Sequence, residues 1–225
     1  EQVREFSWQM ANFLMQKHIK MLVIACNTAT AAALPDLKAK LPIPVIGVIA
    51  PGSRAAIKAS KTHRIGVIAT EGTIHSNAYR DAILSQDPGV KVVSEACPKF
   101  VPLVESNEYR STVAKRVVAE SLRGFKQQNV DTLVMGCTHY PLLRPLIQNV
   151  VGPNVTLIDS GAETVNDVSS VLAYLGLANT SATKRYPDEY FTTGSPEQFT
   201  AIAKDWLALP NFKATHIDLG SESND

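Results

Sequence analysis

The strongest constraint on the fold is a segment that occurs twice, each time ending in a cysteine followed by polar residues. Met21-Leu-Val-Ile-Ala-Cys26-Asn-Thr28 and Thr132-Leu-Val-Met-Gly-Cys137-Thr-His139 align residue for residue. Each begins with a short apolar run typical of a buried strand and leads into a helical stretch that contains proline. The next apolar run starts 19 residues after the first cysteine and 18 residues after the second. The sequence therefore predicts a duplicated strand–helix–strand unit.

Alternating strands and helices along the rest of the chain predict an α/β protein with parallel sheets. We expect two similar domains, each with a parallel sheet flanked by helices, and an active site at their interface. The first domain is predicted over 1–50 plus 160–225, and the second over 51–159. Further expected elements are helices over 2–18, 74–86 and 109–128, strands over 45–49, 64–69 and 90–94, and a proline-rich loop over 96–102.

Composition limits the class of partner. The 225 residues are 45% hydrophobic and 19% charged, which suits a folded core and excludes a disordered chain. The formal net charge is only +1, so no overall positive field exists to bind nucleic acid or an anionic membrane. No apolar run approaches the roughly 20 residues that cross a bilayer. We expect a cytoplasmic protein with neither nucleic acid nor membrane as partner, and its three cysteines as reduced thiols.

Two thiols at the carboxyl ends of parallel strands favour proton-transfer chemistry, because ligands of open α/β sheets bind at that edge. A helix N-terminus lowers the pKa of a thiol, so we expect a lowered pKa for both Cys26 and Cys137. The same helix starts suit a carboxylate ligand. If one thiolate removes the Cα proton of an amino acid and the other thiol protonates the opposite face, the configuration inverts. This scheme uses no cofactor: no lysine Schiff base, no metal and no nucleotide.

The cysteines also allow other interpretations. A lone buried cysteine is usually a small hydrophobic residue, although the repeated context argues against that here. No Cys-x-x-Cys redox motif occurs, and neither cysteine has the arginine spacing of a phosphatase loop. Cys137-x-His139 could supply two metal ligands, but no second pair completes a tetrahedral site. Cys97, which has no duplicate, is expected to be structural.

These motifs resemble those of glutamate racemases in the aspartate/glutamate racemase family. The resemblance rests on Ala25-Cys-Asn-Thr-Ala29 and Gly136-Cys-Thr-His-Tyr-Pro-Leu-Leu143, and it covers nearly the whole chain. Further matching segments are Ala69-Thr-Glu-Gly-Thr73 with Ser76, Cys97-Pro-Lys-Phe-Val-Pro-Leu-Val-Glu105 and Ile158-Asp-Ser-Gly-Ala-Glu163. The histidine and tyrosine after Thr138 are closer to glutamate-specific than to aspartate-specific members.

The resemblance implies a cofactor-independent isomerase that interconverts L- and D-glutamate, the D-isomer supplying peptidoglycan biosynthesis. It implies that Cys26 takes the proton from D-glutamate and Cys137 from L-glutamate. His139 and Glu105 match residues that assist proton transfer on the Cys137 side. Matching substrate contacts are Asn27, Thr28, Thr138 and His139, with Thr73 bordering the site. Family members often pair, so a homodimer is expected.

One departure from the family is that no Asp-Ser-Gly or Pro-Tyr-Gly segment lies upstream of Cys26. The Asp-Ser-Gly at 159–161 matches a separate family motif and does not replace the first. We therefore expect the natural chain to be longer. Two alternatives stay open: a racemase of another acidic amino acid, and a ligand-binding module without turnover. Three single residues also have ordinary explanations, namely His139 as a polar residue at a helix start, Glu105 as a first-turn helix acid and Thr73 as a helix cap.

Overall fold

The computed structural model describes residues 1–181 and 187–220. Its α-helices are α1 Gln2–Gln16, α2 Asn27–Lys40, α3 Ile49–Ala59, α4 Glu71–His75, α5 Ala78–Leu84, α6 Phe100–Glu105, α7 Thr112–Ser121, α8 Arg144–Val151, α9 Ser160–Tyr174 and α10 Pro196–Leu207, with 3-10 helices η1 Arg123–Gln127 and η2 Tyr140–Leu143. Its strands are β1 Leu22–Ile24, β2 Val45–Gly47, β3 Arg64–Ala69, β4 Lys91–Ala96, β5 Thr132–Gly136, β6 Thr156–Asp159, β7 Phe191–Thr192 and β8 Thr215–His216.

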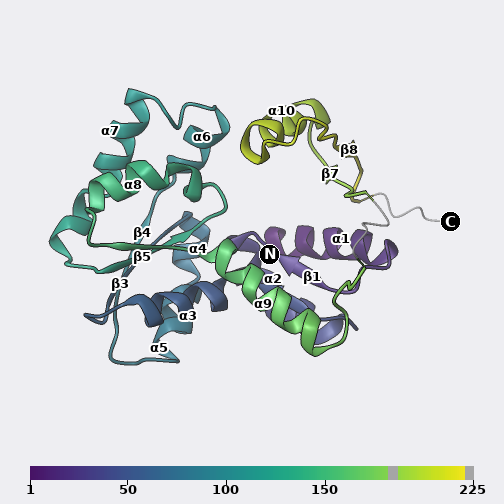
Figure 1. Ribbon diagram of the computed structural model, residues 1–225, viewed down its shortest axis with the longest axis horizontal. Helices are drawn as coiled ribbons and strands as arrows, with labels where there is room; N and C mark the ends of the chain where they lie inside the picture. The colour runs from purple at the N-terminus through teal and green to yellow at the C-terminus, as the bar shows by residue number, and fades with distance from the viewer. Residues whose placement is uncertain (182–186, 221–225) are drawn as a thin grey trace.

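The larger sheet is parallel throughout and has the strand order β4-β3-β5-β6. Helices α6, α7 and α8 cover one face, and α3 and α5 cover the other (Figure 1). Along β5 the side chains alternate between the two cores: Leu133 and Met135 face the first, and Val134 faces the second. The near-continuous apolar runs in the sequence follow from this burial on both faces. The predicted α/β fold with parallel sheets flanked by helices is confirmed.

The smaller sheet repeats the same unit with two strands. β1 pairs in parallel with β2, from Leu22 opposite Val45 to Ile24 opposite Gly47, and α2 connects them. β5 and β6 pair in parallel in the same way, connected through η2 and α8. The duplication read from the sequence is therefore present in the fold. A small core under α1 and α2, built around Ala33 and Leu37, holds this sheet.

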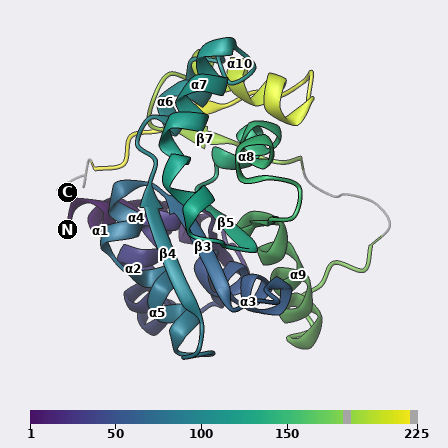
Figure 2. The same ribbon diagram turned by 90° about the vertical axis from the view of Figure 1, so that its left-hand side faces the viewer.

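The C-terminal segment forms a second parallel pair, β7 with β8, joined by α10. α10 lies near α6 and α7 (Figures 1 and 2), and the Tyr109 hydroxyl between these two helices donates to Asp205 of α10 at 3.0 Å. A hollow of about 440 Å³ lies between α1 and β7, lined by apolar side chains such as Phe13, Phe191 and Phe199. None of the predicted site residues lines this hollow, so we do not place the chemistry there.

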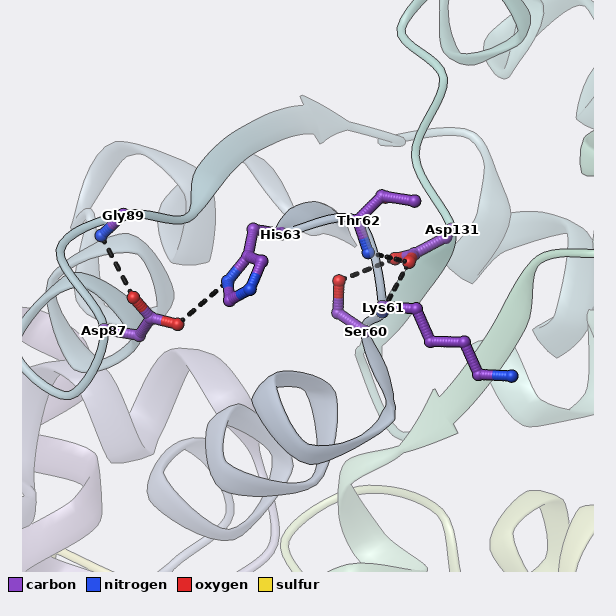
Figure 3. Close-up of polar contacts among 7 residues, drawn as sticks. All are labelled: Ser60, Lys61, Thr62, His63, Asp87, Gly89 and Asp131. Atoms are coloured by element: carbon purple, nitrogen blue, oxygen red, sulfur yellow. Dashed lines mark hydrogen bonds and ion pairs between the residues drawn. The ribbon is translucent and has the colours of Figure 1, made fainter.

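A carboxylate network ties down the edge of the larger sheet where its strands begin. Asp131, just before β5, accepts hydrogen bonds from the Ser60 hydroxyl at 2.7 Å and from the backbone N–H groups of Lys61 and Thr62 at 2.6 and 2.7 Å (Figure 3). Burial opposes ionisation of Asp131, but these hydrogen bonds outweigh it and lower its pKa to about 2. The network lies at the opposite ends of the strands from the cysteines.

Several element boundaries differ from the sequence predictions. The helix expected over 74–86 is two helices, because Asn77 takes a left-handed conformation with φ 56° between α4 and α5. The helix expected over 109–128 starts only at Thr112, capped by Ser111, and gives way to η1. The strand expected over 45–49 ends at Gly47, since α3 begins at Ile49. Part of the loop expected over 96–102 belongs to α6. In the described ranges, none of the helices has the length and apolar character to span a bilayer.

Candidate active site

Cys26 lies at the start of a helix, as predicted. It is the N-cap of α2, and its Sγ accepts a hydrogen bond from the backbone N–H of Ala29 at 3.4 Å. The residue is exposed. The strand-to-helix transition places the thiol there because β1 ends two residues earlier, and a sulfur acceptor takes over the role that a hydroxyl or carboxylate usually fills at an N-cap.

Cys137 occupies the equivalent strand end but a different local structure. It follows β5 directly, and a short turn separates it from η2 at Tyr140. Only 8% of the residue is exposed. Burial raises the pKa of the Cys137 thiol; backbone N–H groups of His139 and Thr138 oppose this rise, and the charge of Cys26 adds to it. The expected lowering of the Cys137 pKa is therefore wrong, because desolvation outweighs the donors and no α-helix begins at this thiol.

Contacts between the two strand ends bring the cysteines to one place. The end of β3 lies beside the end of β5, because Ala69 pairs with Gly136, the residue directly before Cys137. Thr28 Oγ1 lies 2.9 Å from Thr70 Oγ1 and 3.0 Å from Thr73 Oγ1, and the latter two are 3.1 Å apart. This triangle of hydroxyls joins α2 to the end of β3. Thr70, not Thr73, caps α4, so the interpretation of Thr73 as a helix cap is wrong.

On the Cys137 side, a row of polar groups leads away from the sulfur. His139 Nδ1 lies 3.8 Å from Cys137 Sγ and 3.2 Å from Thr138 Oγ1, and His139 Nε2 lies 3.1 Å from Glu105 Oε1. Glu105 is the last residue of α6, so the interpretation as a first-turn helix acid is wrong. Trp206 of α10 packs its ring edge-on against His139, with centroids 5.6 Å apart. The histidine is thus held between a carboxylate and an aromatic ring.

The structure reveals contacts that the sequence interpretation missed. The Tyr79 hydroxyl donates to Asn27 Oδ1 at 2.6 Å and lies 2.5 Å from Ser160 Oγ, and all three residues are buried. Trp206 was missed as well. Nothing in the sequence around either aromatic residue marks it, because both reach the site through long-range packing. Thr70 belongs to the family-like segment 69–73, and a threonine directly after the apolar run 64–69 was the sequence signal for a helix cap.

Two other residues with reactive side chains have structural roles. Asp159 caps α9, accepting from the backbone N–H groups of Gly161 and Ala162 at 2.9 and 3.2 Å. Cys97 is fully buried, and this burial raises its pKa to about 12, which agrees with the expected structural role. Within residues 1–181 and 187–220, no three His, Cys, Asp or Glu side chains gather closely enough to hold a metal ion.

Comparison with known proteins agrees with this geometry. The sequence profile of the family described as Asp/Glu/Hydantoin racemase matches residues 2–168. The glutamate racemase of Lactiplantibacillus plantarum is 77% identical over 225 residues, which cover all of this chain and 82% of that protein. The crystal structure of glutamate racemase isoform RacE1 from Bacillus anthracis superposes with a TM-score of 0.93 at 42% identity, covering 97% of this chain and 81% of that one.

A third relative was solved with a ligand. The crystal structure of glutamate racemase from Francisella tularensis in complex with D-glutamate has a TM-score of 0.86 at 31% identity, covering 98% of this chain and 80% of that chain. The chain therefore belongs to the Asp/Glu/Hydantoin racemase family, a class of amino-acid isomerases. The resemblance noted in the sequence is confirmed.

Proposed function

We propose that this protein is a glutamate racemase that interconverts L- and D-glutamate through two cysteines and without a cofactor. The single observation that carries the proposal is the pair of thiols at duplicated strand ends. The pairing of Ala69 with Gly136 and the hydrogen bonds of Thr28 to Thr70 and Thr73 bring these ends to one place. The similarity to glutamate racemases over the whole chain supports glutamate as the substrate. The product D-glutamate would serve peptidoglycan biosynthesis, as in the family.

Each thiol acts on one face of the Cα atom. Cys26 removes the proton from D-glutamate, and Cys137 then protonates the opposite face; in the reverse direction Cys137 removes the proton from L-glutamate and Cys26 delivers one. A resting Cys137 with a raised pKa carries a proton at neutral pH, which suits its role as donor in the first direction. For the second direction, His139 beside its sulfur, held by Glu105, is placed to accept or return that proton.

The substrate contacts surround the two sulfur atoms. Asn27 and Thr28 occupy the first turn of α2, next to Cys26, and Thr28 also contacts Thr73. Thr138 is exposed directly after Cys137. We assign the carboxylate and ammonium groups of glutamate to these side chains and to His139, because hydroxyl and amide groups near a helix start bind carboxylates. We further propose a cytoplasmic homodimer in which 1–50 with 160–225 forms one domain and 51–159 the other; residues 182–186 and 221–225 of the first domain lie outside the described ranges.

Chirally resolved mass spectrometry of reactions in heavy water tests this function. L- and D-forms of glutamate, aspartate, glutamine and alanine are incubated separately with the protein. We expect the opposite enantiomer, labelled with deuterium at Cα, from both forms of glutamate alone. Turnover of aspartate in preference to glutamate would replace the substrate, and ligand binding without any exchange at Cα would leave a binding module instead of an enzyme.

A further inference from the structure

One buried tyrosine joins elements from both sides of the candidate site. Tyr79 lies on α5 and is 2% exposed. Its hydroxyl donates to Asn27 Oδ1 at 2.6 Å. Since that uses the only proton of the phenol, the Ser160 hydroxyl at 2.5 Å must donate to the Tyr79 oxygen. Asn27 is the first residue of α2 and Ser160 is the first residue of α9, so a single side chain fixes the starts of two helices.

The ring of Tyr79 also packs behind the second cysteine. A Cβ atom added to Gly136, the residue before Cys137, would lie 3.0 Å from Tyr79 Cε2 and 3.0 Å from the carbonyl oxygen of Ile68. Ser160, whose hydroxyl contacts Tyr79, is also closely packed, because a Cβ atom on Gly52 would lie 2.5 Å from Ser160 Oγ. Tyr79 therefore contacts Asn27, the residue after Cys26, and packs closely against Gly136, the residue before Cys137.

Tyr79 is not suited to act as an acid or a base itself. Burial raises the pKa of its hydroxyl far above the usual value, and the hydrogen bond from Ser160 only partly offsets this rise. The phenol is neutral throughout the physiological range, and its 2% exposure keeps it away from a bound ligand. Its influence on the reaction must pass through the groups that it holds.

The amide of Asn27 is one of those groups. Its oxygen is occupied by Tyr79. The Asn27 Nδ2 atom has no hydrogen-bond partner among the described residues. It is also not among the buried side-chain atoms that lack a partner, so it remains accessible to solvent. The amide is therefore oriented with two free N–H donors next to Cys26. A rotated amide would present an oxygen there and would repel a carboxylate.

We propose that Tyr79 is a positioning residue for racemisation, fixing the Asn27 amide beside Cys26 through its hydroxyl and the strand end before Cys137 through its ring. This inference rests on the proposed function. It adds Tyr79, together with Ser160, to the residues on which turnover depends. Neither residue touches the reacting atoms.

A double-mutant cycle with Asn27 separates this role from a merely structural one. We expect Tyr79→Phe to lower kcat/KM for L- and D-glutamate about 10- to 100-fold, as for loss of a hydrogen bond that orients a buried polar group. Because Tyr79 acts through Asn27, the double variant Tyr79→Phe/Asn27→Ala should have a kcat/KM within about twofold of Asn27→Ala alone. Losses that multiply in the double variant would overturn the proposal.

Tyr109→Phe provides the matched control. Tyr109 is 5% exposed and its hydroxyl donates to Asp205 Oδ2 at 3.0 Å, so this change also removes one hydrogen bond from a buried tyrosine. Urea unfolding of both single variants should give similar losses of stability, while Tyr109→Phe keeps kcat/KM within about threefold of the unaltered chain. If Tyr79→Phe loses no more activity than Tyr109→Phe, the proposal is wrong.

Ser160→Ala keeps the test decisive if Tyr79→Phe does not fold. It removes the donor to the Tyr79 oxygen but leaves the ring in place, and we expect kcat/KM to fall about 3- to 10-fold. Unchanged kcat/KM in a folded Ser160→Ala protein would overturn the proposal in that case. An unaltered chain that racemises no acidic amino acid would instead contradict the proposed function itself, which distinguishes the two failures.

Discussion

The Cys26 and Cys137 sides of the site have equivalent positions in a duplicated unit but different surroundings. Cys26 is exposed and caps an α-helix, whereas Cys137 is 8% exposed and is followed by a turn. A histidine and a carboxylate stand behind Cys137, and no such pair stands behind Cys26 among the residues that the structure describes. The repeated strand end therefore places a thiol, while the residues after it determine the burial and the polar neighbours of that thiol.

This difference bears on how the proton of each thiol is handled. The Cys26 sulfur is exposed and accepts the backbone N–H of Ala29 at the start of α2. Cys137 is desolvated, which favours the protonated thiol, and relies on His139 with Glu105 to take its proton. Racemisation needs one base and one acid at a time, so Cys137 is ready to act as the acid and needs this assistance to act as the base.

The largest expected effect comes from removing either thiol. Cys26→Ala and Cys137→Ala should each lower kcat/KM at least about 1000-fold, because each removes one of the two proton-transfer groups. Circular dichroism should show both variants folded. Cys97→Ala is the matched control: this third cysteine is buried in the core, so the change should cost about 1 kcal/mol or more of stability while turnover continues. Full activity in either of the first two variants would remove the two-thiol mechanism.

Replacing His139 should impair proton transfer at Cys137 more than at Cys26. His139→Asn should lower kcat/KM about 100-fold, and equally in both directions because the enantiomers have equal free energy. The isotope effect should not be equal: with deuterium at Cα, L-glutamate should show the larger effect, since the impaired Cys137 then breaks the labelled bond. His75→Asn, an exposed histidine at the end of α4, should change neither quantity. A larger isotope effect from D-glutamate would reverse the assignment of the two cysteines.

Alkylation of the ligand-free protein compares the thiols without turnover. Iodoacetamide at neutral pH should modify Cys26 about tenfold faster than Cys137, because only the thiolate reacts and Cys137 is buried with a raised pKa. Cys97 should react only after unfolding. Peptide mass spectrometry of timed samples gives the three rates. Faster modification of Cys137 than of Cys26 would contradict the contrast drawn between them.

A change far from both thiols should lower stability without altering racemisation. Asp131→Asn should lower the free energy of unfolding by about 1–3 kcal/mol through its three hydrogen bonds, with kcat/KM per folded molecule changed less than about twofold. Since the folded pKa of Asp131 is lowered to about 2, its contribution is fully present above the unfolded pKa and is lost as the pH falls towards the folded value. Urea unfolding at pH 7 and pH 3 should therefore show a smaller difference between variant and parent at pH 3. An equal difference at both pH values would contradict this.

The sequence predicted those parts of the site that depend on local pattern. Apolar runs ending in Cys26 and Cys137 gave the strand ends, and the residues directly after them gave the polar groups nearby. The contact between Thr28 and Thr73, and the positions of Tyr79 and Trp206, depend on how separate elements pack, which no local pattern records. The raised pKa of Cys137 was mispredicted for the same reason, because desolvation is a property of the folded surroundings.

The central claim concerns which hydrogen arrives at the product, and heavy water measures it directly. In the first few per cent of reaction from unlabelled L-glutamate, two thiols on opposite faces should place solvent deuterium in nearly all of the D-glutamate formed and in almost none of the L-glutamate that remains. The same distribution, mirrored, should follow from D-glutamate. Equal deuterium in substrate and product from the start would mean that a single base serves both faces.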